Sequence, residues 1–154
     1  FNVSTVSPGA QELNGFNTEV WREEAQGREA TAQQIMEAVG LLKDEFGNDL
    51  RLVLSGLNIG FDRGFLKVFF DMYGDGVSWR DLFHYRTFDI SSFAFGLGLW
   101  ENSGESLADT LGVPKEPKPH RALNGVFNAV EIYKALREMQ TDQAFQRMAL
   151  AFSE

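Results

Sequence analysis

Cysteine is absent from this 154-residue sequence, and histidine occurs only 2 times. Without a thiol the chain can form no disulfide, no thiolate zinc site and no cysteine-based catalytic centre. Uninterrupted apolar stretches long enough to cross a bilayer are also missing, as is a charged-then-apolar leader. We therefore expect a soluble, cytoplasmic protein that does not associate with membranes.

Several common catalytic signatures are absent as well. The sequence has no glycine-rich phosphate loop of the Walker type, no G-x-S-x-G nucleophile elbow and no H-E-x-x-H zinc motif. Gly56, Gly60 and Gly64 recur at equal intervals, but this spacing differs from the G-x-G-x-x-G pattern of dinucleotide-binding proteins. None of these enzyme classes is supported.

Basic residues are outnumbered, with 14 Lys and Arg against 22 Asp and Glu and a net charge of −8. Because nucleic acids favour a positive surface, the overall charge opposes non-specific binding to DNA or RNA. Any nucleic-acid role must therefore use a local basic patch. The segment containing Lys115, Lys118, His120 and Arg121 is the sequence's one candidate, although charges in such a loop are usually only solvated.

Hydrophobic residues make up 44% of the chain and charged residues 23%, which is ordinary for a soluble globular protein. The length fits a single domain spanning residues 1–154, with a sizeable core. There are 14 Phe residues but only 3 Tyr and 3 Trp, which predicts that the aromatic side chains mostly pack inside.

Strand and helix patterns alternate in the first half of the chain. Two β-like runs around a Ser-Pro-Gly turn, Phe1–Val6 and Leu13–Trp21, predict a hairpin. A helix is predicted from Thr31 to Phe46, a buried strand from Leu50 to Leu54, and a second helix from Phe61 to Tyr73. Helix, strand and helix in this order indicate an α/β protein.

The second half combines a strand with several helical patterns. We predict a loop at 74–78, a strand at 83–90, a short helix from Ser91 that Asp89 caps, and a helix at 106–111. A proline-rich connector at 112–119 should lead to a long helix from Ala122. A break at 140–142 should separate this helix from a last helix through Phe152. The apolar residues expected to face inward on the two longest amphipathic patterns are Phe65, Leu66, Phe69 and Met72, and Ala122, Leu123, Val126, Ala129, Val130, Tyr133 and Leu136.

The segment from Leu52 to Leu66 reads L-V-L-S-G-L-N-I-G-F-D-R-G-F-L. It resembles the strand-loop-helix segment of the DnaQ-like (DEDDh) 3'-5' exonucleases, in which an H-N-x-x-F-D-x-x-F-L pattern places an aspartate at a helix start. The matching residues are Asn58, Phe61, Asp62, Phe65 and Leu66.

Further segments continue the resemblance in the same order. The segment from Ser106 to Pro114 is similar to a shortened form of the family's S-L-x-x-L-x-x-x-L-G-I/V segment, and Pro119 to Val126 resembles the H-x-A-x-x-D motif that opens the last catalytic helix. The resemblance covers most of residues 31–139. It implies a ribonuclease-H-like three-layer α/β fold, with a central mixed sheet of about five strands flanked by helices.

The family's chemistry implies roles for several of these residues. Its members hold two divalent ions with four carboxylates, and a histidine deprotonates the attacking water. The resemblance assigns a metal-binding carboxylate to Asp62 and the general base to His120. Without the resemblance, Asp62 is simply an acid that favours a helix N-terminus. Asn58 and Phe61, together with the cations Lys115, Lys118 and Arg121, become candidate nucleic-acid contacts.

Most of the expected carboxylates are missing. The aspartate of H-x-A-x-x-D falls on Gly125, which has no side chain, and the neighbouring Asn124 is neutral. Glu131, or another acid on the last helix, is a possible substitute. Removing one electrostatic stabiliser from an active site commonly slows a reaction about 10²- to 10³-fold, so these losses predict weak or absent activity.

The family's first motif, D-x-E on the first strand, has two interpretations. If Phe1–Thr5 is that strand, then Asn2 and Ser4 replace both carboxylates. If residues 1–20 are instead the second and third strands, the D-x-E strand lies upstream or was never present. In either case the chain lacks the pair.

We therefore expect a catalytically degenerate exonuclease-like domain that needs no cofactor and binds a protein or nucleic acid. The alternative is an active 3'-5' exonuclease that acts on RNA or single-stranded DNA and uses Mg²⁺ or Mn²⁺ with ligands from outside this chain. A homodimer is a further possibility, with Phe127 as a candidate interface residue.

Overall fold

Helices dominate the described part of the protein. The computed structural model describes residues 8–9, 12, 15, 17–48, 51–101 and 103–151. The structure is mostly helical (66%), and the strands of the described residues form one two-stranded parallel sheet. The predicted ribonuclease-H-like fold with about five strands in a central mixed sheet is therefore wrong for this chain. The described residues do not contain enough strands to build such a sheet.

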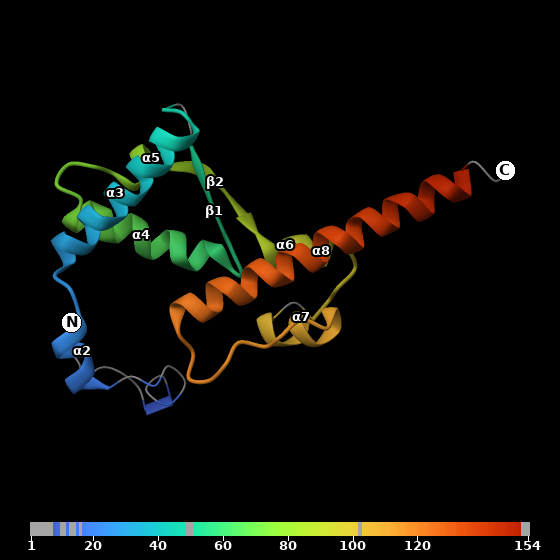
Figure 1. Ribbon diagram of the computed structural model, residues 1–154, viewed down its shortest axis with the longest axis horizontal. Coiled ribbons are helices and arrows are strands. Elements are labelled where there is room, and N and C mark those ends of the chain that lie inside the picture. Colours follow the sequence, from blue (N-terminus) through green and yellow to red (C-terminus); the bar gives the residue numbers. More distant parts are fainter. Residues whose placement is uncertain are drawn as a thin grey trace. The chain divides into compact units, whose positions relative to one another are not determined.

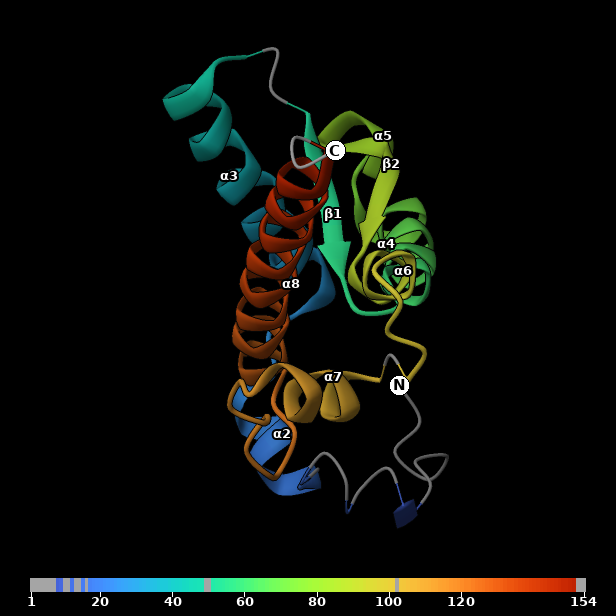
Figure 2. The same ribbon diagram turned by 90° about the vertical axis from the view of Figure 1, so that its right-hand side faces the viewer.

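The chain divides into two compact units, of which the first contains residues 1–6 and 16–88 and the second residues 7–15 and 89–154. The described elements of the first unit are α2 (Thr18–Glu24), α3 (Arg28–Phe46), β1 (Leu52–Gly56), α4 (Ile59–Tyr73), α5 (Trp79–Leu82) and β2 (Phe83–Asp89), whose last residue belongs to the second unit. Parallel strands require a crossover connection, and α4 and α5 provide it here. Figure 2 shows the arrows of β1 and β2 side by side and pointing the same way.

A hydrophobic core holds the first unit together. Helix α3 packs against α4, which also contacts α5 and β1 (Figure 1). The buried core residues come from α3, α4, α5 and β2; they are Ala32, Val39, Phe70, Trp79, Leu82 and Phe83. Replacing a buried aromatic residue with alanine costs about 3–5 kcal/mol, so Phe70 and Trp79 are major sources of stability in this unit.

The second unit contains helices α6 (Ile90–Gly96), α7 (Gly104–Leu111) and α8 (Ala122–Ala151). Both α6 and α7 pack against α8, the long helix coloured orange to red in Figure 1. The buried hydrophobic residues on these helices are Ile90, Ala94, Leu107, Ala108, Ile132 and Leu136. Asp89 caps α6 as predicted, because its Oδ1 accepts the Ser92 backbone N–H at 2.8 Å.

Most helix predictions in the middle of the chain are confirmed, but three element assignments are not. The predicted strand Leu13–Trp21 is wrong, because residues 18–21 belong to α2, where the side chain of Asn17 accepts the Glu19 backbone N–H at 2.8 Å. Its partner strand Phe1–Val6 lies outside the described residues. The break at 140–142 is also wrong, because α8 continues to Ala151. Helix α5 was not predicted, although Ser78 and Asp81 have the spacing of a capping box.

The predicted inward faces need correction as well. On α4, Leu66 and Phe69 pack against the core, whereas Phe65 and Met72 are 64% and 63% exposed. On α8, Leu136 is buried as predicted. The residues of α8 that were expected inside but are exposed are Ala122, Leu123, Val126, Val130 and Tyr133. Phenylalanine is likewise not confined to the core, since Phe46, Phe61, Phe95 and Phe127 are also exposed.

None of the helices in the described ranges is long and apolar enough to cross a membrane.

Candidate functional site

Asp62 lies in the first turn of α4, directly after the turn that follows β1. The helix begins after Asn58, whose left-handed backbone (φ 55°, ψ 41°) reverses the chain direction, and asparagine adopts this conformation more readily than most residues. The Phe61 backbone N–H donates to the Asn58 carbonyl oxygen at 3.0 Å. Asp62 is exposed, and the positive end of the helix dipole favours its negative charge.

Phe61 forms an aromatic pair on the surface of α4. Its ring centroid lies 4.7 Å from that of Phe65, with the two planes inclined at 60°. Asn58, Phe61 and Asp62 are all exposed and lie within one turn of each other at the start of α4. This turn therefore places an exposed aromatic pair beside an exposed polar residue, Asn58.

His120 lies two residues before the start of α8 and is held by a carboxylate. Its Nδ1 is 2.9 Å from Oε2 of Glu116, and the two side chains are 35% and 20% exposed. The second oxygen of Glu116, Oε1, accepts the Arg121 backbone N–H at 3.2 Å. The carboxylate therefore uses both oxygens to hold the imidazole and the chain that enters α8.

Gly125 lies in the first turn of α8, close to the same carboxylate. A Cβ atom at this position would be 3.6 Å from Oε2 and 3.7 Å from Oε1 of Glu116. The carboxylate of Glu116 thus lies near the position where the exonuclease pattern has an aspartate side chain. Sequence reasoning missed Glu116, although its spacing of four residues from His120 in the proline-rich connector was a usable signal.

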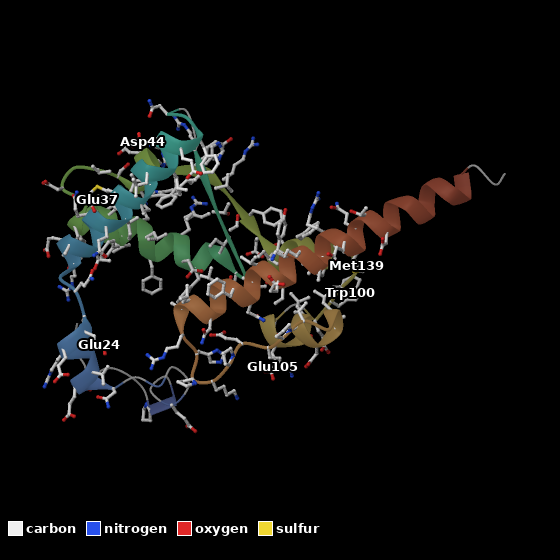
Figure 3. The ribbon with its side chains drawn as sticks, viewed as in Figure 1. Glu24, Glu37, Asp44, Trp100, Glu105 and Met139 are labelled. Atoms are coloured by element: carbon white, nitrogen blue, oxygen red, sulfur yellow. The ribbon has the colours of Figure 1, made fainter. Side chains whose placement is uncertain are left out.

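The predicted basic patch is only partly available for phosphates. Lys115 is paired with two carboxylates of α7. Its Nζ lies 2.7 Å from Oδ2 of Asp109 and 3.4 Å from Oε1 of Glu105, which is labelled in Figure 3. The hydrogen bond with Asp109 is the main reason why the pKa of Lys115 is raised above its usual value. Lys118 and Arg121 are exposed, and within the described ranges neither forms an ion pair. The available positive charge therefore lies on either side of His120.

Glu131 and Phe127, the remaining candidates on α8, lie at the surface. Glu131, the possible substitute carboxylate, pairs with Lys134 at 2.7 Å. Asn128 donates from Nδ2 to the Pro114 carbonyl oxygen at 2.6 Å and thereby ties the connector to α8. Phe127 is exposed.

The predicted residues form two groups, because Asp62 belongs to the first unit and His120 to the second. Among the residues described, no group of three or more Asp, Glu or His side chains is placed to hold a metal ion. These residues do not fit the two-ion centre that the resemblance implies, and no catalytic step through a metal can be derived from them.

No protein-family model and no curated protein matches this chain. The resemblance to the DEDDh exonucleases therefore rests on the sequence segments around Asp62 and His120.

Proposed function

We propose that this chain is a catalytically degenerate, exonuclease-like protein, similar to the DEDDh 3'-5' exonucleases in its sequence segments but not in its sheet, that binds single-stranded RNA or DNA. The observation that carries the proposal is the segment before α8, where Glu116 contacts the imidazole of His120 and the exposed cations Lys118 and Arg121 flank His120 in the sequence. The two cations can donate to phosphate oxygens, which are the main contacts in single-strand binding. The imidazole adds a donor on Nε2 only when it is protonated, because its Nδ1–H is directed at Glu116.

The net charge of −8 limits the affinity of such binding. For a single strand, the logarithm of the binding constant falls linearly with the logarithm of the salt concentration. The slope is about −0.7 for each phosphate that the protein neutralises. Two cations therefore predict a shallow slope of about −1.4 and weak binding that is best observed at low salt.

Loss of cleavage is supported by the residue at position 125. Gly125 cannot supply the carboxylate that the family pattern places there. Asp62 remains as the one match to the metal-binding carboxylates, and it lies exposed on α4.

The test is fluorescence anisotropy with short labelled RNA and DNA strands, measured over a range of salt concentrations. Replacing Lys118 and Arg121 with alanine together should abolish most of the salt-dependent affinity. Lys115→Ala is the matched control, because Asp109 and Glu105 already compensate that charge, and this variant should bind almost as well as the parent protein. Equal binding by the double variant and the parent protein would refute the proposal.

A second candidate function is an active 3'-5' exonuclease whose Mg²⁺ or Mn²⁺ ligands come from outside this chain. The pairing of Glu116 with His120 favours it, because a general base is usually oriented by a second group. Incubation of the protein and the same strands with either ion distinguishes the two candidate functions. Trimming from the 3' end would establish the enzyme if His120→Ala abolishes it and His84→Ala leaves it intact. A protein partner, or a homodimer through Phe127, stays a prediction.

A further inference from the structure

We propose that Glu116 is the positioning residue of His120: it fixes the proton on Nδ1 and leaves Nε2 as the nitrogen that meets a substrate or ligand. The inference rests on the proposed function in so far as His120 is the functional imidazole. The tautomer itself can be measured on the free protein, so the two proposals can fail separately.

The direction of the hydrogen bond determines the tautomer. An ionised carboxylate can only accept, so the contact of 2.9 Å between Oε2 of Glu116 and Nδ1 of His120 requires a proton on Nδ1. A neutral imidazole has one protonated nitrogen, and Nε2 must then carry the lone pair. In this state Nε2 can accept a proton from water or a hydroxyl group, as a general base does.

Glu116 is itself held in place, which makes it suitable for this role. Its Oε1 accepts the backbone N–H of Arg121, the residue just before α8, at 3.2 Å. The helix dipole favours a negative charge at this end of α8. Pro117 and Pro119, between the two partners, restrict the backbone φ angles of the connecting segment.

Gly125 leaves the carboxylate of Glu116 without a longer side chain beside it. A Cβ at this position would lie in ordinary van der Waals contact with Glu116, at 3.6 Å from Oε2. A longer acidic side chain there would bring a second negative charge against the first, which disfavours the ionised forms of both. The glycine therefore removes one acid from the family pattern and leaves the neighbouring Glu116 carboxylate without a second negative charge beside it.

The alternative explanation is that Glu116 only anchors the start of α8. That role requires the hydrogen bond from the Arg121 backbone and does not depend on the tautomer of His120. A test must therefore observe the imidazole directly, because a change in stability alone would follow from either role.

Nitrogen NMR of the protein with ¹⁵N-labelled histidine makes this observation, at a pH where the imidazoles are neutral. The spectrum is simple because the chain has 2 histidines. His84 is an internal reference with the opposite arrangement, since its Nδ1 accepts the Arg86 backbone N–H at 3.0 Å and its proton must lie on Nε2. We expect His120 to show the Nδ1–H form and His84 the Nε2–H form.

Variants then test the cause. Glu116→Ala should shift His120 toward the Nε2–H form, and Glu116→Gln should give a mixture, because an amide can either accept from Nδ1–H or donate to Nδ1. Glu131→Gln is the matched control on α8, with its partner Lys134 away from the imidazole, and should leave both signals unchanged. If Glu116→Ala fails to fold, Glu116→Leu takes its place, because its side chain also has no acceptor for the Nδ1 proton.

The outcomes also separate this inference from the proposed function. An Nε2–H form of His120 in the parent protein, or an unchanged spectrum in folded Glu116→Ala or Glu116→Leu, would overturn the positioning role even if His120 is needed for nucleic-acid binding. A tautomer that depends on Glu116, with no effect of His120→Ala on binding or cleavage, would support the positioning role and refute a function for His120.

Discussion

Gly125 lies in the first turn of α8, beside the carboxylate of Glu116. Its φ angle lies outside the left-handed region, and the distances of 3.6–3.8 Å to that carboxylate leave room for a methyl group. Neither conformation nor a close backbone contact therefore requires glycine here. The residue matters for what it lacks, which is a side chain that would compete with Glu116.

Gly125→Ala is expected to stabilise the protein. Glycine in a helix is about 0.5–1 kcal/mol less favourable than alanine because it loses more backbone entropy on folding, and the added Cβ meets no clash. Urea denaturation measures the change in the free energy of unfolding. Gly40→Ala on α3, where a Cβ meets nothing within 4 Å, is the control and should behave alike. A clear loss of stability in the position 125 variant alone would contradict the geometry.

The sequence was informative about individual site residues but not about their partners. Asp62 and His120 were placed correctly at the starts of helices, because helix starts have local signals. Glu116 was missed, and Lys115 was expected to be available although it pairs with Asp109. The spacing of four residues was a local signal for the pair of Glu116 and His120. The pairing of Lys115 with α7 depends on how the connector turns back toward that helix, and local residue patterns do not specify that turn.

At the level of helices, α4 shows why periodicity is ambiguous. Apolar residues occupy more than one face of this helix: Leu66, Phe69 and Phe70 pack in the core, while Phe61 and Phe65 are exposed. A helix with apolar residues on several faces is recognised easily, but the pattern does not tell which face is packed. The contacts of α4 with α3, α5 and β1 decide this.

The short helix α5 depends on an ionised aspartate. The Ser78 backbone N–H donates to the Asp81 carboxylate at 2.8 Å, and this hydrogen bond is the main reason why the pKa of Asp81 lies below its usual value. A lowered pKa in the folded state means that the contribution to stability is present above the pKa of the unfolded chain. It is lost as the pH falls through the pKa of the folded state.

Asp81→Asn is therefore expected to destabilise the protein at neutral pH and to matter less in acid. The difference in unfolding free energy between the variant and the parent protein should shrink below about pH 4, where the aspartate of the unfolded chain becomes protonated. Urea denaturation at several pH values measures this difference. Asp44→Asn, an exposed position on α3, controls for the loss of a charge. A difference that does not change with pH would rule out the ionised cap.

For the whole chain, the central question is whether the two compact units fold together. Each unit has its own buried residues, around Phe70 in the first and around Leu136 in the second. A chain of this length buries a larger fraction of its surface as one domain than two smaller domains would. The prediction of a single domain over residues 1–154 therefore implies one cooperative unfolding transition.

Phe70→Ala tests this implication. Phe70 is 2% exposed, and its truncation should cost about 3–5 kcal/mol. If folding is cooperative, amide hydrogen exchange should become faster in α7 and α8 as well as in α3 and α4. Leu41→Ala on α3, where the side chain is 70% exposed, is the matched control and should change little. Faster exchange confined to α3 and α4 would show two independent units.

Local residue patterns account for the positions of α3, α4, β2 and α7, because capping residues, glycine stops and apolar spacing act over a few neighbouring residues. They also place Asp62 and His120 at helix starts. The number of strands, the packed face of α4 and the partner of His120 depend on contacts between segments that are distant in the sequence or separated by a turn. Those contacts are set by packing and by pairing of charges in three dimensions, and for this reason only the tertiary structure revealed the two-stranded sheet and the contact between Glu116 and His120.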